Sequence, residues 1–542
     1  MSTTSIPSAR ARAKTRVSFG RFKAWLVACA TRPEASLWLV IQLAILHAVL
    51  WTFILINLKA AQDVHMDVAE AYAWGQKFLF GYGKHPPLSG WIAGLWFKAF
   101  PATDWATYAL AMATVSVGMV ICWLVALRVV DARRAFLVVV MVALYPIFNF
   151  KGFKYNADLL QLVTLPLVVL AYLNAFEKRS WQSGFFLGLA GALALMTKYW
   201  VLTMIGAIGL AALLHPERLK FLRSPAPWVA IATLLVAMIP HIIWLAEAHF
   251  VPLTYAGDTY SLEGHESYVR QLVFGYVLHN VALLALPVAL AALAIALVPP
   301  WFTLLLRAPL RIVTRAWARG ANSGVDRSQA LNVWIIQIIV ALGPPLGALA
   351  FSVYLKTDWG ISLFFLVPLA LVAIPALRVQ GASLFNIAAI WLVLSVATLA
   401  ASPWIATREM AANAGNTATY GARSELAREL THAWHTRFAS RWPVVAGTME
   451  TIQPMVFYSQ DHPSPFTPNE AWSSGLTSLE DVKKEGFIGV FDTTDPRLPA
   501  FEKWMSETAP NAERMVMTTR RFTHGKAGPA MTWNVYIAPP AK

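Results

Sequence analysis

Four ionisable residues stand close together in the stretch Asp63–Trp91, which reads DVHMDVAEAYAWGQKFLFGYGKHPPLSGW. They are Asp67, Glu70, Lys84 and His85, in a chain where only 13% of the residues are charged. Asp67 and Glu70 are three residues apart, so on a helix their carboxylates share one face. Carboxylates can accept a proton from a hydroxyl or hold a metal ion, and a lysine beside a histidine can receive a phosphate.

The two acids alone also fit a plainer interpretation. Charges beside a membrane-spanning segment are common, and an amphipathic helix at the interface would expose the acids and place Tyr72 and Trp74 at the membrane surface. The sequence GYGKHPPLSGW that follows favours a functional loop. Each proline after His85 locks its own φ and restricts the residue before it, which predicts an extended turn. A second interfacial helix is then predicted over Leu88–Phe100.

Three further polar residues stand beside other apolar segments. Lys198 separates two apolar half-spans, where it is either a snorkelling lysine or a phosphate ligand. Asp158 opens an apolar segment. It could orient a lysine, share a metal, or cap a helix by accepting its first free N–H groups. Lys154 adds a cation just before it. Cations of this kind can stabilise the charge that develops on a departing phosphate.

The composition is that of an integral membrane protein. Of 542 residues, 57% are hydrophobic and 13% are charged. In a soluble domain about a quarter of the residues are charged. The net charge of +15 would suit nucleic acid. However, the basic residues fall in short clusters between apolar segments, as expected for cytoplasmic loops, so no nucleic-acid partner is predicted. Cys29 and Cys122 form neither a disulfide framework nor a metal-ligand spacing.

Hydropathy predicts about eleven spanning segments. They are Ala35–Leu58, Tyr108–Leu127, Ala135–Phe150, Leu159–Ala175, Phe185–Thr197, Tyr199–Leu214, Pro227–Ala246, Val273–Val298, Val333–Leu355, Ile361–Leu377 and Leu384–Ser402. Basic residues are concentrated on the side that holds the N-terminal tail, which predicts a cytoplasmic N-terminus. An odd number of spans then places the C-terminal region outside.

The sequence divides into three predicted parts. Residues 1–34 are a basic cytoplasmic tail, and residues 35–402 are the membrane domain, whose first external loop is 58–106. Residues 403–542 are polar and predict a small external α/β domain. Its predicted helices are Ser424–Phe438, Leu479–Lys484 and Ala500–Thr508, and its predicted strands are Val444–Ala446, Phe487–Phe491, Met515–Thr519 and Thr532–Ile537. RRFTHGKAGPA, at residues 520–530, predicts a hairpin connection. The fold class is therefore an all-α polytopic membrane protein with a small α/β domain.

The order of motifs resembles glycosyltransferase family 39 and its GT-C relatives, which include protein O-mannosyltransferases and the transferases of aminoarabinose and galacturonic acid to lipopolysaccharide. The resemblance is carried by Glu70-Ala71-Tyr72, by Gly-Tyr-x-x-His-Pro-Pro-Leu-x-x-Trp at residues 81–91, and by Asn156-Ala157-Asp158, Lys198-Tyr199 and Pro240…Trp244. It covers residues 35–260 well and residues 270–400 by topology. It implies the GT-C membrane fold.

The resemblance also implies roles for the residues. An acid of the first external loop would be the base. Asp67 lies nearest the usual aspartate, and Glu70 matches the glutamate that normally follows it directly, although Ala69 precedes it here. The residues that would bind the donor phosphate are Lys84, His85, Lys198 and Lys154, and those in supporting positions are Asp158, Tyr72 and Tyr199. Some relatives carry an acid where Lys84 stands, so the loop does not indicate a metal, and a divalent metal is left open.

The function implied is transfer of a sugar from a polyprenyl-phosphate donor to a lipid, glycan or protein hydroxyl, with inversion. It would take place at the periplasmic face of a bacterial inner membrane. No Walker loop or Rossmann fingerprint supports direct use of a nucleotide sugar. The alternative is a transporter or flippase of a lipid-linked sugar. Transporters usually place their charges at mid-membrane in two related halves, whereas here the charges gather in one external loop.

Overall fold

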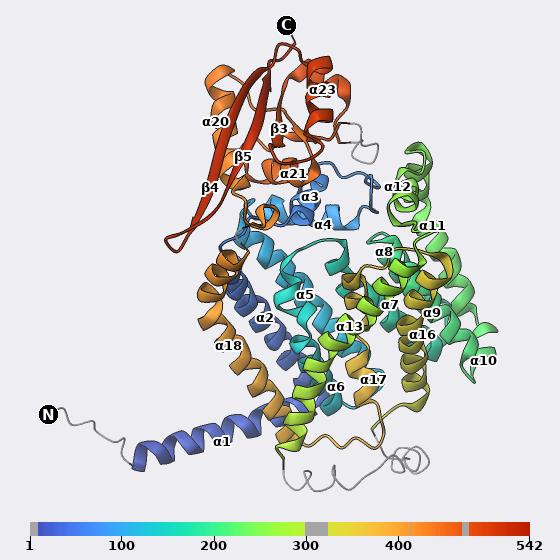
Figure 1. The fold of residues 1–542 in the computed structure, drawn as a ribbon. Coiled ribbons are helices and arrows are strands. Elements are labelled where there is room, and N and C mark those ends of the chain that lie inside the picture. The colour runs from blue at the N-terminus through green and yellow to red at the C-terminus, as the bar shows by residue number, and fades with distance from the viewer. Residues whose placement is uncertain (1–8, 299–323, 414, 469–475, 542) are drawn as a thin grey trace, which may run out of the picture.

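The structure, a computed structural model, describes residues 9–298, 324–413, 415–468 and 476–541. A helical bundle forms the larger part, and a smaller α/β part sits on one end of it (Figure 1). Helix α1 (Ala9–Thr31) lies at the opposite end of the bundle. Helices α3 and α4 lie between the bundle and the α/β part, so the first external loop is enclosed by both.

Helices make up the whole of the described bundle. The α-helices after α1 are α2 (Pro33–Leu58), α3 (Met66–Gly75), α4 (Leu88–Ala99), α5 (Asp104–Leu127), α6 (Ala132–Leu144), α7 (Ala157–Lys178), α8 (Trp181–Leu195), α9 (Leu202–Leu214), α10 (Arg218–Leu222), α11 (Pro225–Glu247), α12 (Val251–Tyr260), α13 (Glu266–Ala296), α16 (Arg327–Phe351), α17 (Val367–Val372) and α18 (Gly381–Ala412). Short 3-10 helices are η1 (Pro146–Phe148), η2 (Phe150–Phe153), η3 (Tyr199–Val201) and η4 (Thr357–Phe364).

Seven of the described helices are long and apolar enough to cross a membrane. Helix α6 and the segment Pro146–Phe153, which is bent 77° from it, form an eighth span if they are counted together. The helices α8 and α9 are shorter, and 15 residues of helix measure about 22 Å against a bilayer core of about 30 Å. The predicted span Ile361–Leu377 folds as η4 followed by α17. The chain is a multi-pass membrane protein, and the number of eleven spans stays a prediction.

Local caps set the ends of the helices nearest the site. The Asn156 side chain accepts a hydrogen bond from the backbone N–H of Leu159 at 2.9 Å and so caps α7. The prediction that Asp158 might cap this helix is therefore wrong. Helix α7 ends at Arg179, whose φ of 56° is left-handed, and Ser180 then caps α8.

The α/β part has five strands in the order β2-β1-β3-β5-β4. They are β1 (Val444–Gly447), β2 (Ser464–Phe466), β3 (Phe487–Asp492), β4 (Glu513–Thr523) and β5 (Lys526–Ala538). Strand β1 is parallel to β2 and β3, whereas β5 is antiparallel to β3 and β4. The predicted hairpin is confirmed, because β4 and β5 are joined at His524 and Gly525, both with positive φ.

Helices pack on this sheet and complete its core. They are α19 (Thr417–Tyr420), α20 (Arg423–Arg437), α21 (Met449–Tyr458), α22 (Leu479–Glu485) and α23 (Leu498–Thr508). The predicted helices correspond to α20, α22 and α23, and the four predicted strands correspond to β1, β3, β4 and β5. The short strand β2 and helix α21 were not predicted. The predicted fold class is confirmed: helices that can span a membrane, and a small α/β part.

Ion pairs and hydrogen bonds fasten the α/β part to the first external loop. Arg521 Nη1 of strand β4 lies 2.7 Å from Asp63 Oδ1, and the backbone N–H of Arg423 donates to Asp63 Oδ2 at 2.7 Å. The Tyr458 hydroxyl accepts a hydrogen bond from the Val64 N–H at 2.7 Å. The segment that leads into α3 is therefore held from the α/β side.

Candidate active site

Helix α3 places both predicted acids on the wall of one cavity. The cavity has a volume of about 370 Å³ and lies at the end of the bundle nearest the α/β part. Its lining residues are Met66, Asp67, Glu70, Ala71, Trp74, Lys84, His85, Ser89, Asn156, Ala157, Asp158, Lys198, Tyr255, Thr259, Tyr260, Tyr354, Lys356 and Trp359. Six of the predicted site residues are thus brought together: Asp67, Glu70, Lys84, His85, Asp158 and Lys198.

Asp67 lies among positive and hydrogen-bonding groups. Asn156 Nδ2 donates to Asp67 Oδ2 at 2.9 Å, and Lys154 Nζ lies 3.7 Å from the same oxygen. Burial alone would raise the pKa of this carboxyl, but the charges of His65 and Lys154 outweigh burial and hold the pKa well below its usual range. Asp67 is therefore a permanently ionised carboxylate. Lys154 does not line the cavity, and its charge influences the cavity through its ion pair with Asp67.

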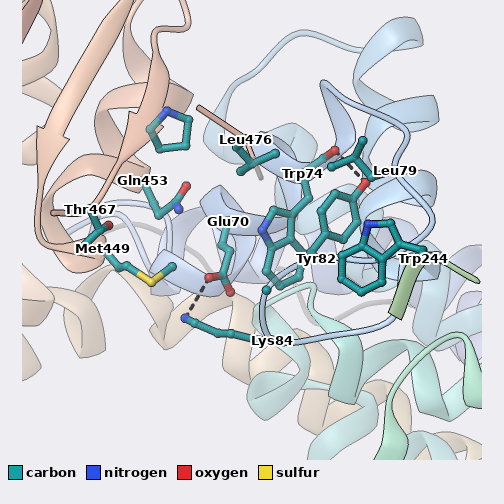
Figure 2. A pocket seen from close by; sticks show the side chains of 13 residues that line it. Glu70, Trp74, Leu79, Tyr82, Lys84, Trp244, Met449, Gln453, Thr467 and Leu476 are labelled. Atoms are coloured by element: carbon teal, nitrogen blue, oxygen red, sulfur yellow. Dashed lines mark hydrogen bonds and ion pairs between the residues drawn. The ribbon is translucent and has the colours of Figure 1, made fainter. Parts of the chain in front are cut away.

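Glu70 pairs with a different lysine. Lys84 Nζ lies 2.9 Å from Glu70 Oε1, and both side chains are largely buried (Figure 2). Burial raises the pKa of Glu70 above its usual value, and the Lys84 ammonium opposes that rise only in part. Glu70 is consequently the more basic of the two predicted candidates for the base, Asp67 and Glu70.

Lys198 and Asp158 form a third acid–lysine pair. Lys198 precedes η3, at the break between α8 and α9, and its Nζ lies 2.7 Å from Asp158 Oδ1. The ammonium also sits 5.0 Å from the centre of the Trp359 ring. The side chain is buried inside the protein, so the snorkelling interpretation is wrong. Asp158 orients this lysine, which was one of its predicted roles.

His85 is not a cation at neutral pH. Burial, together with the charge of Lys198, lowers the pKa of its imidazole to about 3. The ring lies edge-on to Trp74, with 5.9 Å between the two ring centres. His85 could therefore meet a phosphate oxygen only through a neutral N–H group.

The two predicted supporting tyrosines lie away from the cavity. Tyr72 is buried, and its ring packs edge-on against Phe97 and Phe457, so it does not lie at a membrane interface. Tyr199 and His241 form a hydrogen bond of 3.0 Å between the hydroxyl and Nε2. His241 Nδ1 must donate to the Phe80 carbonyl at 2.7 Å, since a carbonyl only accepts, so Tyr199 is the donor to Nε2.

One wall of the cavity holds none of the predicted catalytic, phosphate-binding or supporting residues. Tyr255 and Tyr260 come from α12, while Lys356 and Trp359 come from the segment around the start of η4. Among the described residues Lys356 is in no ion pair within 4.0 Å, unlike Lys84 and Lys198. Its only signal in the sequence was a positive charge in a predicted external loop, against the positive-inside trend.

The acids of the cavity do not converge. Over the described residues, no three His, Cys, Asp or Glu side chains are arranged to hold a metal ion. Each of the three carboxylates instead faces a lysine, within 3.7 Å for Asp67 and within 2.9 Å for the other two. Lys84, Lys198 and Lys356 line the cavity with these three carboxylates, and Lys154 beside Asp67 is a fourth cation, so lysines outnumber carboxylates in and beside the cavity, which suits an anionic ligand.

The chain is similar to known proteins in its sequence and in its fold. Residues 84–244 match the model of the dolichyl-phosphate-mannose-protein mannosyltransferase family. The lipid A galacturonosyltransferase RgtD of Rhizobium johnstonii is 25% identical over 210 residues, which are 37% of this chain and 42% of the relative. The alignment therefore spans less than half of the relative's length.

The fold is also similar to that of ArnT from Cupriavidus metallidurans. The ArnT structure bound to undecaprenyl phosphate matches with a TM-score of 0.54 and 11% identity, over 94% of this chain and all of that one. The apo structure of ArnT gives the same TM-score and identity, over 93% of this chain and 99% of that one. The chain thus has a fold similar to that of ArnT and a segment that matches the mannosyltransferase family model, so its resemblance to family 39 and the GT-C glycosyltransferases is confirmed.

Proposed function

We propose that this protein is a membrane glycosyltransferase that moves a sugar from a polyprenyl phosphate to a hydroxyl of a lipid, glycan or protein. The observation that carries the proposal is the cavity in which Asp67 and Glu70 face a surplus of lysines. A basic carboxylate beside cations is the arrangement that proton removal and phosphate departure require.

The lysines suit the donor. A polyprenyl-phosphate sugar carries one negative charge, and the phosphate gains a second when the sugar leaves. Lys356 has no carboxylate partner within 4.0 Å among the described residues, so its charge is available to the phosphate, while Lys84 and Lys198 remain within the same cavity. The ArnT structure, solved with undecaprenyl phosphate, supports this class of donor.

The carboxylates suit the acceptor. As the acceptor oxygen bonds to the anomeric carbon, its proton passes to a carboxylate. The bond from that carbon to the phosphate oxygen breaks, and its electron pair stays on the phosphate. Attack from the side opposite the phosphate inverts the anomeric centre. The sequence favours Asp67 as the base, whereas the electrostatics favour Glu70, because its raised pKa makes it the better proton acceptor.

The face of the membrane follows from the charges. We infer that the N-terminus lies in the cytoplasm, and that the cavity and the α/β part lie in the periplasm of a bacterial inner membrane. The basic residues are concentrated in the N-terminal tail and in the loops on the same side of the membrane as that tail, which is the pattern of cytoplasmic segments. A lipid A galacturonosyltransferase among the relatives supports a lipopolysaccharide component as acceptor.

The test compares the native host with strains that carry Asp67→Asn or Glu70→Gln. Mass spectrometry of extracted glycolipids and of polyprenyl-phosphate sugars measures product and donor together. Loss of one sugar from the glycolipid, with accumulation of the lipid-linked donor and unchanged protein in the membrane, is the expected result. Glu263→Gln, an exposed acid of another loop, is the matched control. If deletion of the chain abolishes the product while both acid variants make it normally, the transferase proposal fails and a transporter is favoured.

A further inference from the structure

A second, smaller cavity lies between the first external loop and the α/β part (Figure 2). Its residues from the loop and bundle are Glu70, Trp74, Leu79, Gly81, Tyr82, Gly83, Lys84 and Trp244, and those from the α/β part are Met449, Gln453, Pro465, Thr467 and Leu476. Its volume of about 30 Å³ has room for roughly two water molecules or one hydroxymethyl group, and not for a whole sugar ring.

The two cavities share a wall. Glu70, Trp74 and Lys84 line both of them, so the Glu70–Lys84 ion pair separates the small cavity from the large one. A group in the small cavity can therefore contact the carboxylate from the side opposite the lysine-rich wall of the large cavity.

Gln453 is a buried amide of α21 and is 3% exposed. Its Oε1 accepts no hydrogen bond from the described residues. Its side chain makes no hydrogen bond to any residue that the structure describes. Gln453, from α21, and Glu70, from α3, both line this cavity (Figure 2). Since buried polar atoms in native proteins are almost always paired, this oxygen is suited to a ligand that donates a hydrogen bond.

Aromatic rings form the remaining wall. The rings of Trp74 and Tyr82 are stacked, with centres 4.9 Å apart and planes within 5°. Trp244 packs onto the backbone of Gly81, where a Cβ would come within 2.2 Å of the indole ring. Flat apolar faces around a few placed polar groups are typical of sites for small organic groups.

We propose that the small cavity receives the hydroxyl-bearing tip of the acceptor, a sugar of a glycolipid, and that Gln453 recognises it. The hydroxyl of one hydroxymethyl group donates to Gln453 Oε1 inside the small cavity, and the acceptor's reacting hydroxyl stays outside it, beside Glu70. The inference rests on the proposed function and adds that donor and acceptor approach the Glu70–Lys84 pair from different cavities. It also gives the α/β part a role in choosing the acceptor.

The test uses the full-length protein in nanodiscs. The acceptor probe is total glycolipid extracted from a host strain that lacks this chain, and the donor probe is the polyprenyl-phosphate sugar fraction of the same strain. Gln453→Leu and Gln453→Met remove the acceptor oxygen. Both are expected to raise the KM for the glycolipid about tenfold, the equivalent of one lost hydrogen bond, and to leave the KM for the donor unchanged. Thr451→Val, a buried change on the same helix outside the cavity, is the control.

Binding is measured separately from transfer. Titration of the glycolipid into the purified protein is followed by calorimetry, and Gln453→Leu should weaken this binding by the same factor even when no donor is present. If glycolipid binding and the KM for the glycolipid are unchanged in both Gln453 variants, Gln453 holds only water and the inference is wrong. If the variants raise the KM only for a protein acceptor, the acceptor recognised by Gln453 is not a glycolipid. If the wild type binds glycolipid but transfers nothing, the proposed function fails while this inference stands.

Discussion

Lys84 Nζ lies 2.9 Å from Glu70 Oε1, and this ion pair forms the common wall of two cavities. One residue of the pair comes from α3, and the other comes from the loop that precedes the two prolines. A carboxylate in this position can receive a proton from one side while its lysine faces a phosphate on the other. The pair is therefore where the proposed chemistry is most easily tested.

Glu70→Gln removes the more basic carboxylate and keeps its size. We expect kcat to fall about 10²- to 10⁴-fold, the usual contribution of a general base. Asp67→Asn should cost less, because the ionised Asp67 is held by Asn156 and Lys154 and is the weaker base. Single-turnover transfer with a saturating donor measures both. A larger loss in Asp67→Asn would return the role of base to Asp67.

The pH dependence of transfer distinguishes the two acids independently. A base works only when deprotonated, so the rate falls as the pH drops through its pKa. Because burial raises the pKa of Glu70 above 4.5, the acidic limb of kcat/KM should lie above pH 4.5. Lys84→Met removes the opposing ammonium and should move this limb to higher pH. The pKa of Asp67 lies well below 3.8, so an acidic limb below that pH would identify Asp67 instead.

Lys356→Ala should weaken binding of the donor and leave binding of the acceptor unchanged. Its charge has no carboxylate partner among the described residues, so a phosphate would be its counter-ion. We expect the KM for the donor to rise about tenfold, the effect of one charge-assisted hydrogen bond. Lys356→Arg should keep most of the affinity. Steady-state kinetics at two salt concentrations test this, with Lys483→Ala on the exposed α22 as control. An equal effect of both alanine variants would contradict the prediction.

Arg521→Met should loosen the α/β part from the first external loop. Arg521 pairs with Asp63, whose side chain is only 5% exposed, and removing one partner of a buried pair costs about 3–5 kcal/mol. The neighbouring Arg520 is exposed, so Arg520→Met should leave the thermal unfolding of the purified protein unchanged. Adding Asp63→Asn to Arg521→Met should recover part of the lost stability, because the Asp63 charge then no longer stays buried without Arg521. Additive losses in the double variant would rule out the pairing.

The local elements could be predicted from the sequence because they depend on local periodicity. Long apolar runs indicated the spanning helices, and short strand-like runs indicated β1, β3, β4 and β5. The Gly-Lys-His-Pro-Pro run marked the loop, and the spacing of Asp67 and Glu70 placed both on one face of α3. The strand β2 was missed because three residues carry too little pattern. The break at Lys198 was visible as an interruption of an apolar run, whereas the division of the predicted span Ile361–Leu377 into η4 and α17 was not predicted.

Only the tertiary structure decided which groups meet. The sequence named Lys84, Lys154 and Lys198 together as phosphate ligands, and packing assigned each to a different acid: Glu70, Asp67 and Asp158. It also brought Lys356 and Trp359 to the larger cavity and placed Gln453 in the lining of the small cavity with Glu70. These neighbours come from helices far apart in the chain. Their distances follow from how whole helices pack on one another, and no local pattern in a sequence records that packing.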